Sequence, residues 1–273
     1  MKHLSKDLYT KKDIIDQLSA MDAPQDSVVL MHSSLRLVGK VDGGGEALLD
    51  TLIEYFTARG GLFCVPTHTW AFMNEDITLD MTKPDTCLGA FSQIALRHTG
   101  GLRSENPTHS MVVFGEKERA RAFIEGEIDL PSGTAPNSCY GKIFEQGGHI
   151  LLVGVAHNRN TYLHCVDELL GIPNRLSEPR TVRIKRADGE TVERRIRGHQ
   201  NSYGIDISLR FPQFEPAFRY YGCITDGFIG NAPTQLCDAK GMKRVMEIIF
   251  ERSGAEDPLK DERDIPPRLF ARY

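Results

Sequence analysis

Short apolar runs flanked by polar residues predict the strands of a buried sheet. The runs Val28–Met31, Leu62–Val65 and Ile150–Val155 have the length and composition of strands that are covered on both faces. Apolar positions at helical spacing lie between Thr10 and Met21 and again over residues 47–56, which predicts an amphipathic helix in each segment. The resulting order of strand, helix and strand predicts a βαβ unit with a right-handed connection.

A different pattern between Thr181 and Ile196 predicts an antiparallel element. Apolar and charged residues alternate there on both sides of the turn dipeptide Asp188-Gly189, which is typical of a β-hairpin. We therefore expect an α/β fold with a mixed or mostly parallel central sheet flanked by helices. The whole chain of 273 residues is expected to form a single domain, with the small antiparallel β-hairpin as an insertion at about residues 172–215. A further helix is expected over Met242–Ile249, and the charged tail 256–273 either wraps the body or stays mobile.

The composition is that of an ordinary globular protein, with 40% hydrophobic residues, 26% charged residues and a net charge of −4. It excludes a mainly disordered chain, a collagen and a cationic nucleic-acid packager, so no nucleic-acid partner is expected. No apolar run approaches the roughly 18–20 residues of a membrane span, and the charged N-terminal segment has no signal-peptide core. We therefore expect a cytoplasmic protein without membrane contact. Its six scattered cysteines lack CxxC spacing, which indicates reduced thiols.

Several sequence motifs that define large enzyme classes are missing from the chain. It has neither a GxGxxG run after a strand nor a GxxxxGK[S/T] run, so a standard dinucleotide fold and a P-loop are not expected. A GxSxG elbow is also missing. Ser33, at the tip of the first predicted strand, nevertheless stays open as a nucleophile.

Polar residues follow each of the three predicted strands. These tips are His32-Ser33-Ser34, Thr67-His68-Thr69 and Asn160–His164, and ligands of open α/β sheets bind beyond the carboxyl ends of the strands. At the first tip, the two serine hydroxyls and the glycine run Gly43–Gly45 can hold a pyrophosphate through hydroxyl and backbone N–H groups. The same serines can instead cap a helix, and the glycines can form a simple turn. His68, like His109, lies near an expected loop, where a histidine more often has a structural role.

The segment after the third strand contains the best catalytic candidates. On a helix, Asp167 and Glu168 lie three and four residues beyond His164, so either carboxylate can share a face with the imidazole. A carboxylate that fixes the tautomer of His164 would make it a general base at neutral pH. Thr161, one turn earlier, can donate to a developing oxyanion, whereas Cys165 would point away from this face. The same pattern also fits a helix N-cap with a surface ion pair, and no second ligand at metal spacing is present.

Short motifs follow one another along the chain in the order in which they occur in one known family. They are His32–Leu35 with Gly39 and Gly43-Gly44, Gly61–Thr67, Asp85-Thr86 with Gly89-Ala90, Arg103-Ser104 with Asn106-Pro107 and Ser110, Pro131–Lys142, Leu151–Val155, Asn160–His164 and Gly230–Ala232. By this order, over most of its length, the chain resembles the aminoglycoside 3-N-acetyltransferase (antibiotic N-acetyltransferase) family.

The resemblance implies a donor, an acceptor and a set of site residues. The donor is acetyl-CoA, no metal is required, and the acetyl group passes directly to an amine, most directly the 3-amino group of an aminoglycoside antibiotic. His164 would help to deprotonate this amine, with Thr161 and one of Asp167 and Glu168 as its partners. The implied coenzyme contacts are His32, Ser33, Ser34, Leu35, Thr67, Arg103 and Ser110. Resistance to such antibiotics would be one biological role.

Two departures from the family pattern bear on this assignment. The family's HxxE has Asp167 in the acid position here, with Glu168 one residue later, and the histidine of its HP dipeptide is Asn106. The expected hairpin, Arg180–Arg197, also contains seven basic and three acidic residues. The resemblance places this region at the border of the acceptor cleft, where a polycationic substrate would prefer carboxylates. The basic residues can instead form a solvated face.

Three other functions remain open at this point. The chain can be an N-acetyltransferase for a non-antibiotic amine metabolite, or a CoA-binding protein without catalysis. It can also be a serine hydrolase that uses Ser33 with His164. The oligomeric state is open as well, with a homodimer as one assembly to consider.

Overall fold

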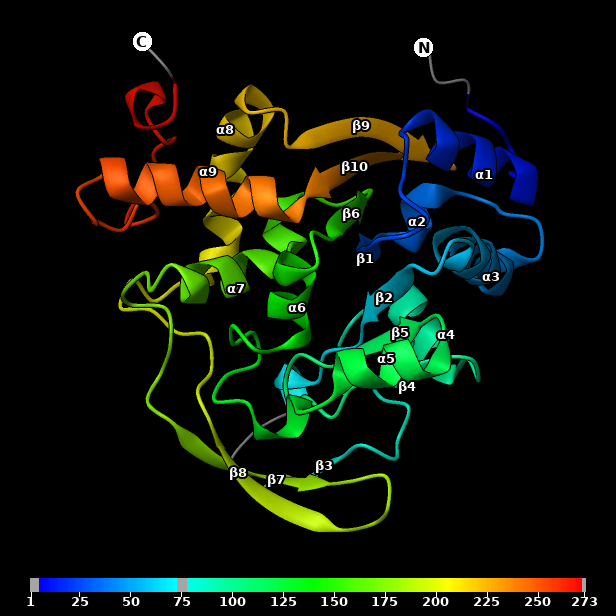
Figure 1. Ribbon diagram of the computed structural model, residues 1–273, viewed down its shortest axis with the longest axis horizontal. Helices are drawn as coiled ribbons and strands as arrows, with labels where there is room; N and C mark the ends of the chain where they lie inside the picture. Colours follow the sequence, from blue (N-terminus) through cyan, green and yellow to red (C-terminus); the bar gives the residue numbers. More distant parts are fainter. Residues whose placement is uncertain (1–4, 73–77, 272–273) are drawn as a thin grey trace.

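Three parallel strands form the centre of the main sheet in the computed structural model, which describes residues 5–72 and 78–271. Strand β1 (Val28–Ser33) pairs with β2 (Leu62–Pro66) on one side and with β6 (His149–Val153) on the other. Helix α3 (Gly44–Thr57) connects β1 to β2, as Figure 1 shows. The predicted βαβ unit is therefore confirmed, with its strands extended by one or two residues.

The outer strands of this sheet are antiparallel, so the sheet is mixed. Strand β5 (Met111–Phe114) pairs with β2 and β4 (Leu102–Arg103) pairs with β5. At the other edge, β10 (Ala232–Asp238) pairs with β6 and β9 (Ile224–Ile229) pairs with β10. The strand order is β4-β5-β2-β1-β6-β10-β9. Of the two predicted alternatives, a mixed and a mostly parallel sheet, the mixed sheet is correct. The strands β4, β5, β9 and β10 were not expected from the sequence.

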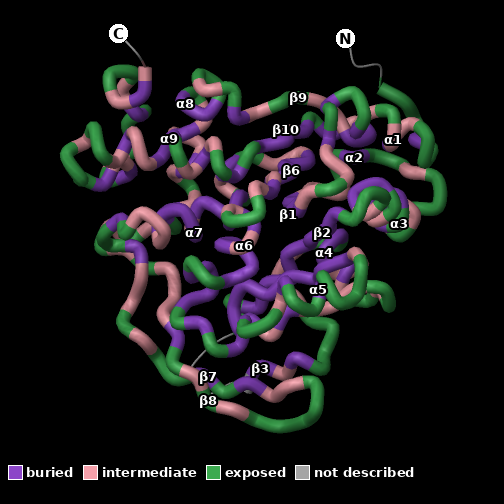
Figure 2. The backbone as a smooth tube through the Cα atoms, in the orientation of Figure 1, coloured by how far each residue is buried: buried purple, intermediate pink, exposed green. Residues whose placement is uncertain are grey.

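Helices cover both faces of the main sheet and bury one apolar cluster on each. Along β1, Val28 and Leu30 face one cluster, whereas Val29 and Met31 face the other, as the alternation of a strand requires. Besides α3, the helices of the described segments are α1 (Lys11–Ala20), α2 (Leu35–Val38), α4 (Ala90–Arg97), α5 (Lys117–Ile124), α6 (Cys139–Glu145), α7 (Tyr162–Leu169), α8 (Glu215–Tyr220) and α9 (Ala239–Arg252). The first cluster packs against α6, α7, α8 and α9, and the second packs against α1, α3 and α4. Figure 2 shows the buried residues concentrated along the strands between these layers.

Two of these helices follow their sequence signals closely. Helix α1 begins after Thr10, whose side chain and Asp13 form a capping box that satisfies free N–H groups of the first turn. Helix α9 contains the predicted segment Met242–Ile249 and extends it at both ends. Five 3-10 helices join the described elements: η1 (Trp70–Phe72), η2 (Glu127–Asp129), η3 (His157–Arg159), η4 (Ile207–Phe214) and η5 (Pro267–Leu269). No helix of the described segments has the length and apolar character needed to cross a membrane.

The predicted hairpin is present and belongs to a second, smaller sheet. Strands β7 (Arg180–Lys185) and β8 (Thr191–Ile196) are antiparallel, and β3 (Thr78–Asp80) adds to β7 in parallel. Ile184 and Ile196 form a separate small apolar cluster with residues of β3 and η2. In Figure 1 this sheet lies at the bottom of the view, away from the main sheet. The treatment of the whole chain as one domain with this insertion stays a prediction.

The C-terminal tail wraps the body as far as residue 271. Leu259, Ile265 and Phe270 are buried in the cluster beside α9, and the Tyr221 hydroxyl donates to the carbonyl oxygen of Phe270 at 2.7 Å. Of the two alternatives for the tail, wrapping is therefore correct for its described part, because apolar side chains anchor it.

Candidate active site

A cavity of about 750 Å³ opens at the carboxyl ends of the central strands. Ser33 of β1 and Pro66 of β2 line it, together with Thr161 and His164 from the start of α7. This position agrees with the rule that ligands of α/β sheets bind beyond the strand ends. Loops that follow β2, β4 and β8 contribute to the walls, so segments far apart in the sequence meet here.

Histidines dominate the polar wall of this cavity. The five that line it are His32, His68, His109, His164 and His199. Four of their rings form a continuous series, with centroid distances of 4.7 Å between His68 and His109, 4.8 Å between His109 and His199 and 3.9 Å between His199 and His164. The last two rings are nearly parallel, at 10°. Of these histidines, His164 was the one expected to be catalytic and His32 was an expected coenzyme contact, whereas His68 and His109 were interpreted as structural residues.

Burial keeps these imidazoles neutral. The pKa of His164 lies well below its usual range because of burial first and then the neighbouring His199 and Arg175. Burial also lowers the pKa of His199 to about 4 and that of His32 to about 3. A neutral imidazole has one nitrogen that accepts a hydrogen bond or a proton. At pH 7 these histidines therefore offer proton acceptors instead of positive charges.

Helix α7 holds His164 at the edge of this cavity. Thr161 occupies its N-cap position and Phe211 packs its ring edge-on against the imidazole, with centroids 4.8 Å apart. Cys165 is fully buried in the core on the other side of the helix, and burial raises the pKa of its thiol well above the usual range. The expectation that Cys165 faces away from His164 is correct.

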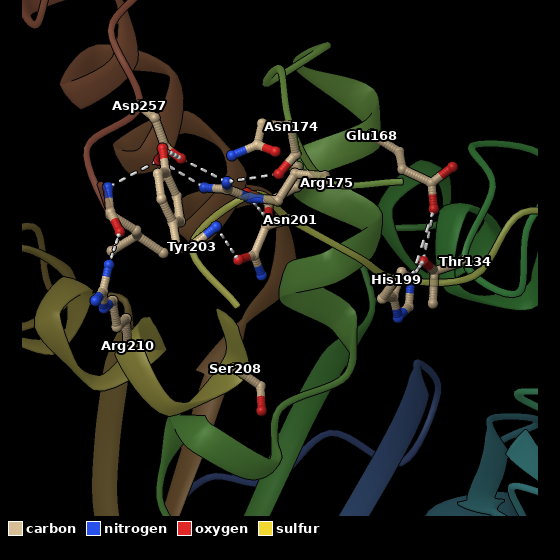
Figure 3. Close-up of polar contacts among 12 residues, drawn as sticks. Thr134, Glu168, Asn174, Arg175, His199, Asn201, Tyr203, Ser208, Arg210 and Asp257 are labelled. Atoms are coloured by element: carbon tan, nitrogen blue, oxygen red, sulfur yellow. Dashed lines mark hydrogen bonds and ion pairs between the residues drawn. The ribbon is translucent and has the colours of Figure 1, made fainter. Parts of the chain in front are cut away.

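The two carboxylates that follow His164 have other partners. Asp167 accepts a hydrogen bond from Arg175 Nε at 2.7 Å. Arg175 also binds Asp257 through two hydrogen bonds of 2.6 Å, and Figure 3 shows these two side chains together. Within residues 5–72 and 78–271, no hydrogen bond joins Asp167 or Glu168 to the His164 ring. Asp167 instead ties α7 to the tail, and a catalytic role for it stays a prediction.

Glu168 reaches the histidine series through a hydroxyl group. Its carboxylate accepts hydrogen bonds from Ser132 at 2.6 Å and from Thr134 at 2.7 Å, and the Thr134 oxygen lies 2.8 Å from His199 Nε2. Glu168, Thr134 and His199 thus form a chain of hydrogen bonds beside His164, drawn in Figure 3. Sequence reasoning missed His199; the one signal for it was a polar His-Gln-Asn run directly after the predicted hairpin.

The first strand tip lies at the cavity as expected. His32 and Ser33 line it, and His32 Nε2 is buried without a hydrogen-bond partner among the described residues. Ser34 and Leu35 follow at the start of α2 and are not among the lining residues. Their contact with a coenzyme stays a prediction, as does that of His32 and Ser33.

The other expected coenzyme contacts do not line the cavity. Thr67 and Ser110 are fully buried and their hydroxyl oxygens lie 3.0 Å apart. Arg103 donates to the carbonyl oxygens of Lys83 and Asp85, and burial lowers its pKa to about 10. Thr67, Ser110 and Arg103 hold loops together here and are not among the lining residues, so their role toward a coenzyme is untested.

Asn106, where the family has a histidine, supports a loop of the cavity. Its side-chain amide donates to Glu127 Oε2 and to the carbonyl oxygen of Gly133, and its oxygen accepts from the backbone N–H of His109. Asn106 is fully buried. The substitution therefore leaves a polar residue that fixes the turn before His109.

The charged residues that line the cavity are few. Among the described residues they are Arg159, Arg180 and Asp206, and the carboxylate of Asp206 accepts a hydrogen bond from the backbone N–H of Ser208 at the start of η4. The basic hairpin contributes Arg180, whereas its Arg186 and Arg194 form ion pairs with Glu105 and Asp129. The described segments contain no group of three or more His, Cys, Asp or Glu side chains that could hold a metal ion.

Known proteins resemble this chain in sequence and in fold. A prophage-derived aminoglycoside N(3')-acetyltransferase-like protein of Bacillus subtilis is 24% identical over 178 residues, which are 58% of this chain and 64% of the relative. Aminoglycoside N(3)-acetyltransferase VII of Streptomyces paromomycinus is 26% identical over 283 residues, which cover 93% and 94% of the two chains. The match thus spans less than two thirds of the first relative's length and nearly all of the second's.

Solved structures share the whole arrangement. Aminoglycoside acetyltransferase AAC(3)-IVa in complex with a gentamicin matches with a TM-score of 0.77 and 24% identity over 92% of each chain. AAC-IIIb in complex with CoASH matches with a TM-score of 0.76 and 21% identity over 90% of this chain and 97% of the other. The family model described as aminoglycoside 3-N-acetyltransferase matches residues 30–251, which include every strand of the main sheet but the first two residues of β1. The chain belongs to the aminoglycoside 3-N-acetyltransferase family.

Proposed function

We propose that this protein transfers an acetyl group from acetyl-CoA to an amine bound in the histidine-lined cavity, with the 3-amino group of an aminoglycoside as the acceptor. The observation that carries the proposal is the neutral imidazole of His164 on the cavity wall, in a chain of this family. Of the similar structures, one is a complex with CoASH and another a complex with a gentamicin, which supports these two ligand classes.

The chemistry requires a proton acceptor beside the amine. An alkylammonium has a reference pKa of about 10, so at neutral pH it has to lose a proton before its nitrogen attacks the thioester. In the proposal, His164 takes this proton, and a positioned base of this kind typically contributes about 10²–10⁴-fold. The N–C bond forms, the C–S bond breaks, and the coenzyme leaves as its thiol. Thr161, which lines the same wall, is the proposed donor to the oxyanion.

The tip of β1 is the proposed binding site for the coenzyme. His32 and Ser33 line the cavity there, and the unpartnered His32 Nε2 is available to a polar ligand because an unmet buried polar group is unfavourable. Arg159, also on the lining, is exposed and has no ion pair among the described residues. It is a proposed contact for an anionic group of the coenzyme.

A second acceptor class, a non-antibiotic amine with few positive charges, is favoured by the charge of the cavity. Two arginines and one aspartate line it, and the aspartate already caps η4. A polycation is attracted to a cleft lined with carboxylates, and among the described lining residues the arginines outnumber the one carboxylate. Acetyl transfer is common to both acceptor classes, so a single acceptor panel separates them.

The test is thiol release from acetyl-CoA with a matched panel of amines. The panel contains aminoglycosides with several amino groups, simple amino sugars with one amine, and amines that also carry a carboxylate. Release with the aminoglycosides supports the first acceptor, and release with the low-charge amines alone replaces it with the second. No release with any amine above the rate without acceptor contradicts the transferase proposal. Trp70, the one tryptophan of the sequence, lines the cavity, so its fluorescence reports coenzyme binding separately.

Two alternatives from other functional classes give different results in the same assays. A CoA-binding protein without catalysis would show thermal stabilisation by CoA and no turnover with any amine. A serine hydrolase would lose all activity in Ser33→Ala, whereas a transferase would mainly bind the coenzyme more weakly. No hydrogen bond between Ser33 and His164 occurs in the part of the chain that the structure describes, which favours the transferase over the hydrolase.

A further inference from the structure

His199 is held in the cavity by a chain of hydrogen bonds that begins at a buried carboxylate. An ionised carboxylate only accepts hydrogen bonds, so the Thr134 hydroxyl donates its proton to Glu168 over 2.7 Å. The Thr134 oxygen is then an acceptor for His199 Nε2, which lies 2.8 Å away. The proton of a neutral His199 therefore resides on Nε2.

This arrangement leaves the other ring nitrogen of His199 as an acceptor. Among the described residues no hydrogen bond engages His199 Nδ1, and the residue lines the cavity. Its ring lies face to face with that of His164, with centroids 3.9 Å apart. Glu168 thus fixes the His199 ring through Thr134 and leaves its second nitrogen free. A carboxylate that holds an imidazole in this way orients it as a general base. His164 has no such carboxylate of its own among the described residues.

We propose that His199 is a second proton acceptor of the reaction, fixed as the Nε2–H tautomer by Glu168 through Thr134, and that it acts together with the stacked His164. The inference rests on the proposed acetyl transfer. The amine nitrogen loses one proton to the imidazole pair as the N–C bond forms, and the pair returns one proton to the coenzyme sulfur as the C–S bond breaks. Two like charges at this ring separation repel each other strongly, so the pair holds one proton at a time.

The tautomer is tested by NMR, without reference to activity. Long-range ¹H–¹⁵N spectra of histidine-labelled protein at pH 7 are expected to show His199 as a neutral ring protonated on Nε2, with His199→Asn identifying its signals. Thr134→Val, which removes the hydroxyl at nearly constant volume, is expected to release this preference, and Thr134→Ser is expected to restore it. The matched control is Ser132→Ala, which removes the other hydroxyl from Glu168 and leaves the His199 tautomer unchanged. A His199 that is protonated on Nδ1 or positively charged at pH 7 overturns the proposal.

The catalytic role is tested with variants that separate the two ring nitrogens. His199→Gln keeps a donor near the Nε2 position for Thr134 and removes the Nδ1 acceptor, so kcat is expected to fall at least about tenfold with KM for acetyl-CoA within about threefold. Thr134→Val is expected to lower kcat in the same direction, Thr134→Ser to recover most of it, and Ser132→Ala to stay within about threefold of the wild type. A kcat of His199→Gln within about threefold of the wild type overturns the role of His199. If the wild type releases no thiol with any amine, the proposed function fails, and the NMR result alone decides the tautomer.

Discussion

At the scale of single residues, the surroundings of a side chain decide its chemistry more than its identity does. His164 is one of nine histidines in the sequence, and His98 is another, which forms a hydrogen bond with Asp50 on the surface. His164 differs because burial and its stacked neighbour His199 hold its pKa well below the usual range. Its lone pair is therefore available at neutral pH.

Replacing His164 tests this residue as a base. His164→Ala is expected to lower turnover in the thiol-release assay at least about tenfold, because a positioned base contributes about 10²–10⁴-fold. His98→Ala, which removes an imidazole from the surface, is the matched control and is expected to keep turnover within about twofold of the wild type. Near-normal turnover of His164→Ala would contradict its assignment as the base.

The residues of the site were predictable to different degrees. His164, Thr161, His32 and Ser33 stand beside predicted strands, so the rule for α/β sheets brought them to the cavity. His199 follows the hairpin, and its place beside His164 depends on contacts between segments far apart in the sequence. Helical spacing placed carboxylates near His164, but it does not show which partners outside the helix these carboxylates bind.

At the scale of elements, a buried arginine ties α7 to the C-terminal tail. Arg175 lies between Asp167 of α7 and Asp257 of the tail, and the exposed fraction of each of the three side chains is at most 7%. Tyr203 adds a hydrogen bond to Asp257 at 2.8 Å. Helix α7, which holds His164, is therefore fixed at its end by two charged groups outside the helix.

Removing this arginine is expected to destabilise the fold strongly. Arg175→Met leaves two carboxylates buried without their partner, which typically costs about 3–5 kcal/mol of unfolding free energy. Arg219→Met is the control, since Arg219 also binds two carboxylates, Glu215 and Asp226, but at the surface, where such pairs contribute about 0–1 kcal/mol. Urea unfolding of both variants measures the difference. Equal losses would show that burial of the Arg175 ion pairs has no special importance.

Two of the four main-sheet strands that the sequence did not predict contain residues that are unfavourable in strands. Strand β9 contains Asp226 and Gly227, and β10 contains Pro233; these residue types are unfavourable within strands. Both strands lie at one edge of the main sheet, where β10 pairs with β6 and β9 pairs with β10. Strands β1, β2 and β6 were predictable because both of their faces are buried and their apolar runs are continuous.

At the scale of the whole molecule, the basic hairpin is neutralised by residues from other parts of the chain. Lys185, Arg186 and Arg194 pair with Asp80, Glu105 and Asp129. The local positive excess of the sequence is thus largely matched in space by these three carboxylates. Of the hairpin's basic residues, Arg180 reaches the lining. The described part of the cavity wall therefore presents neutral imidazoles beside few charged side chains.

Neutral, buried histidines also make the stability of the whole molecule depend on pH. Burial lowers the pKa of His157 to about 4, from 6.5 for an exposed histidine, and its Nε2 is buried without a hydrogen-bond partner among the described residues. The unfolded chain binds a proton at this residue between these two pH values and the folded chain does not. Its contribution to stability is therefore complete above pH 6.5 and is lost as the pH falls to about 4.

His157→Asn isolates this effect, because asparagine keeps an acceptor for Asn160, which donates to His157 Nδ1 at 3.1 Å, and does not titrate. Between pH 7 and pH 5 the wild type is expected to lose about 2 kcal/mol more unfolding free energy than the variant. Urea unfolding at the two pH values measures this difference, and effects of all other groups, including the carboxylates, cancel between the two proteins. The comparison uses the change with pH within each protein, so a variant that is less stable overall still gives a clear result. Equal pH dependence in both proteins would mean that His157 is protonated as readily in the folded state as in the unfolded chain.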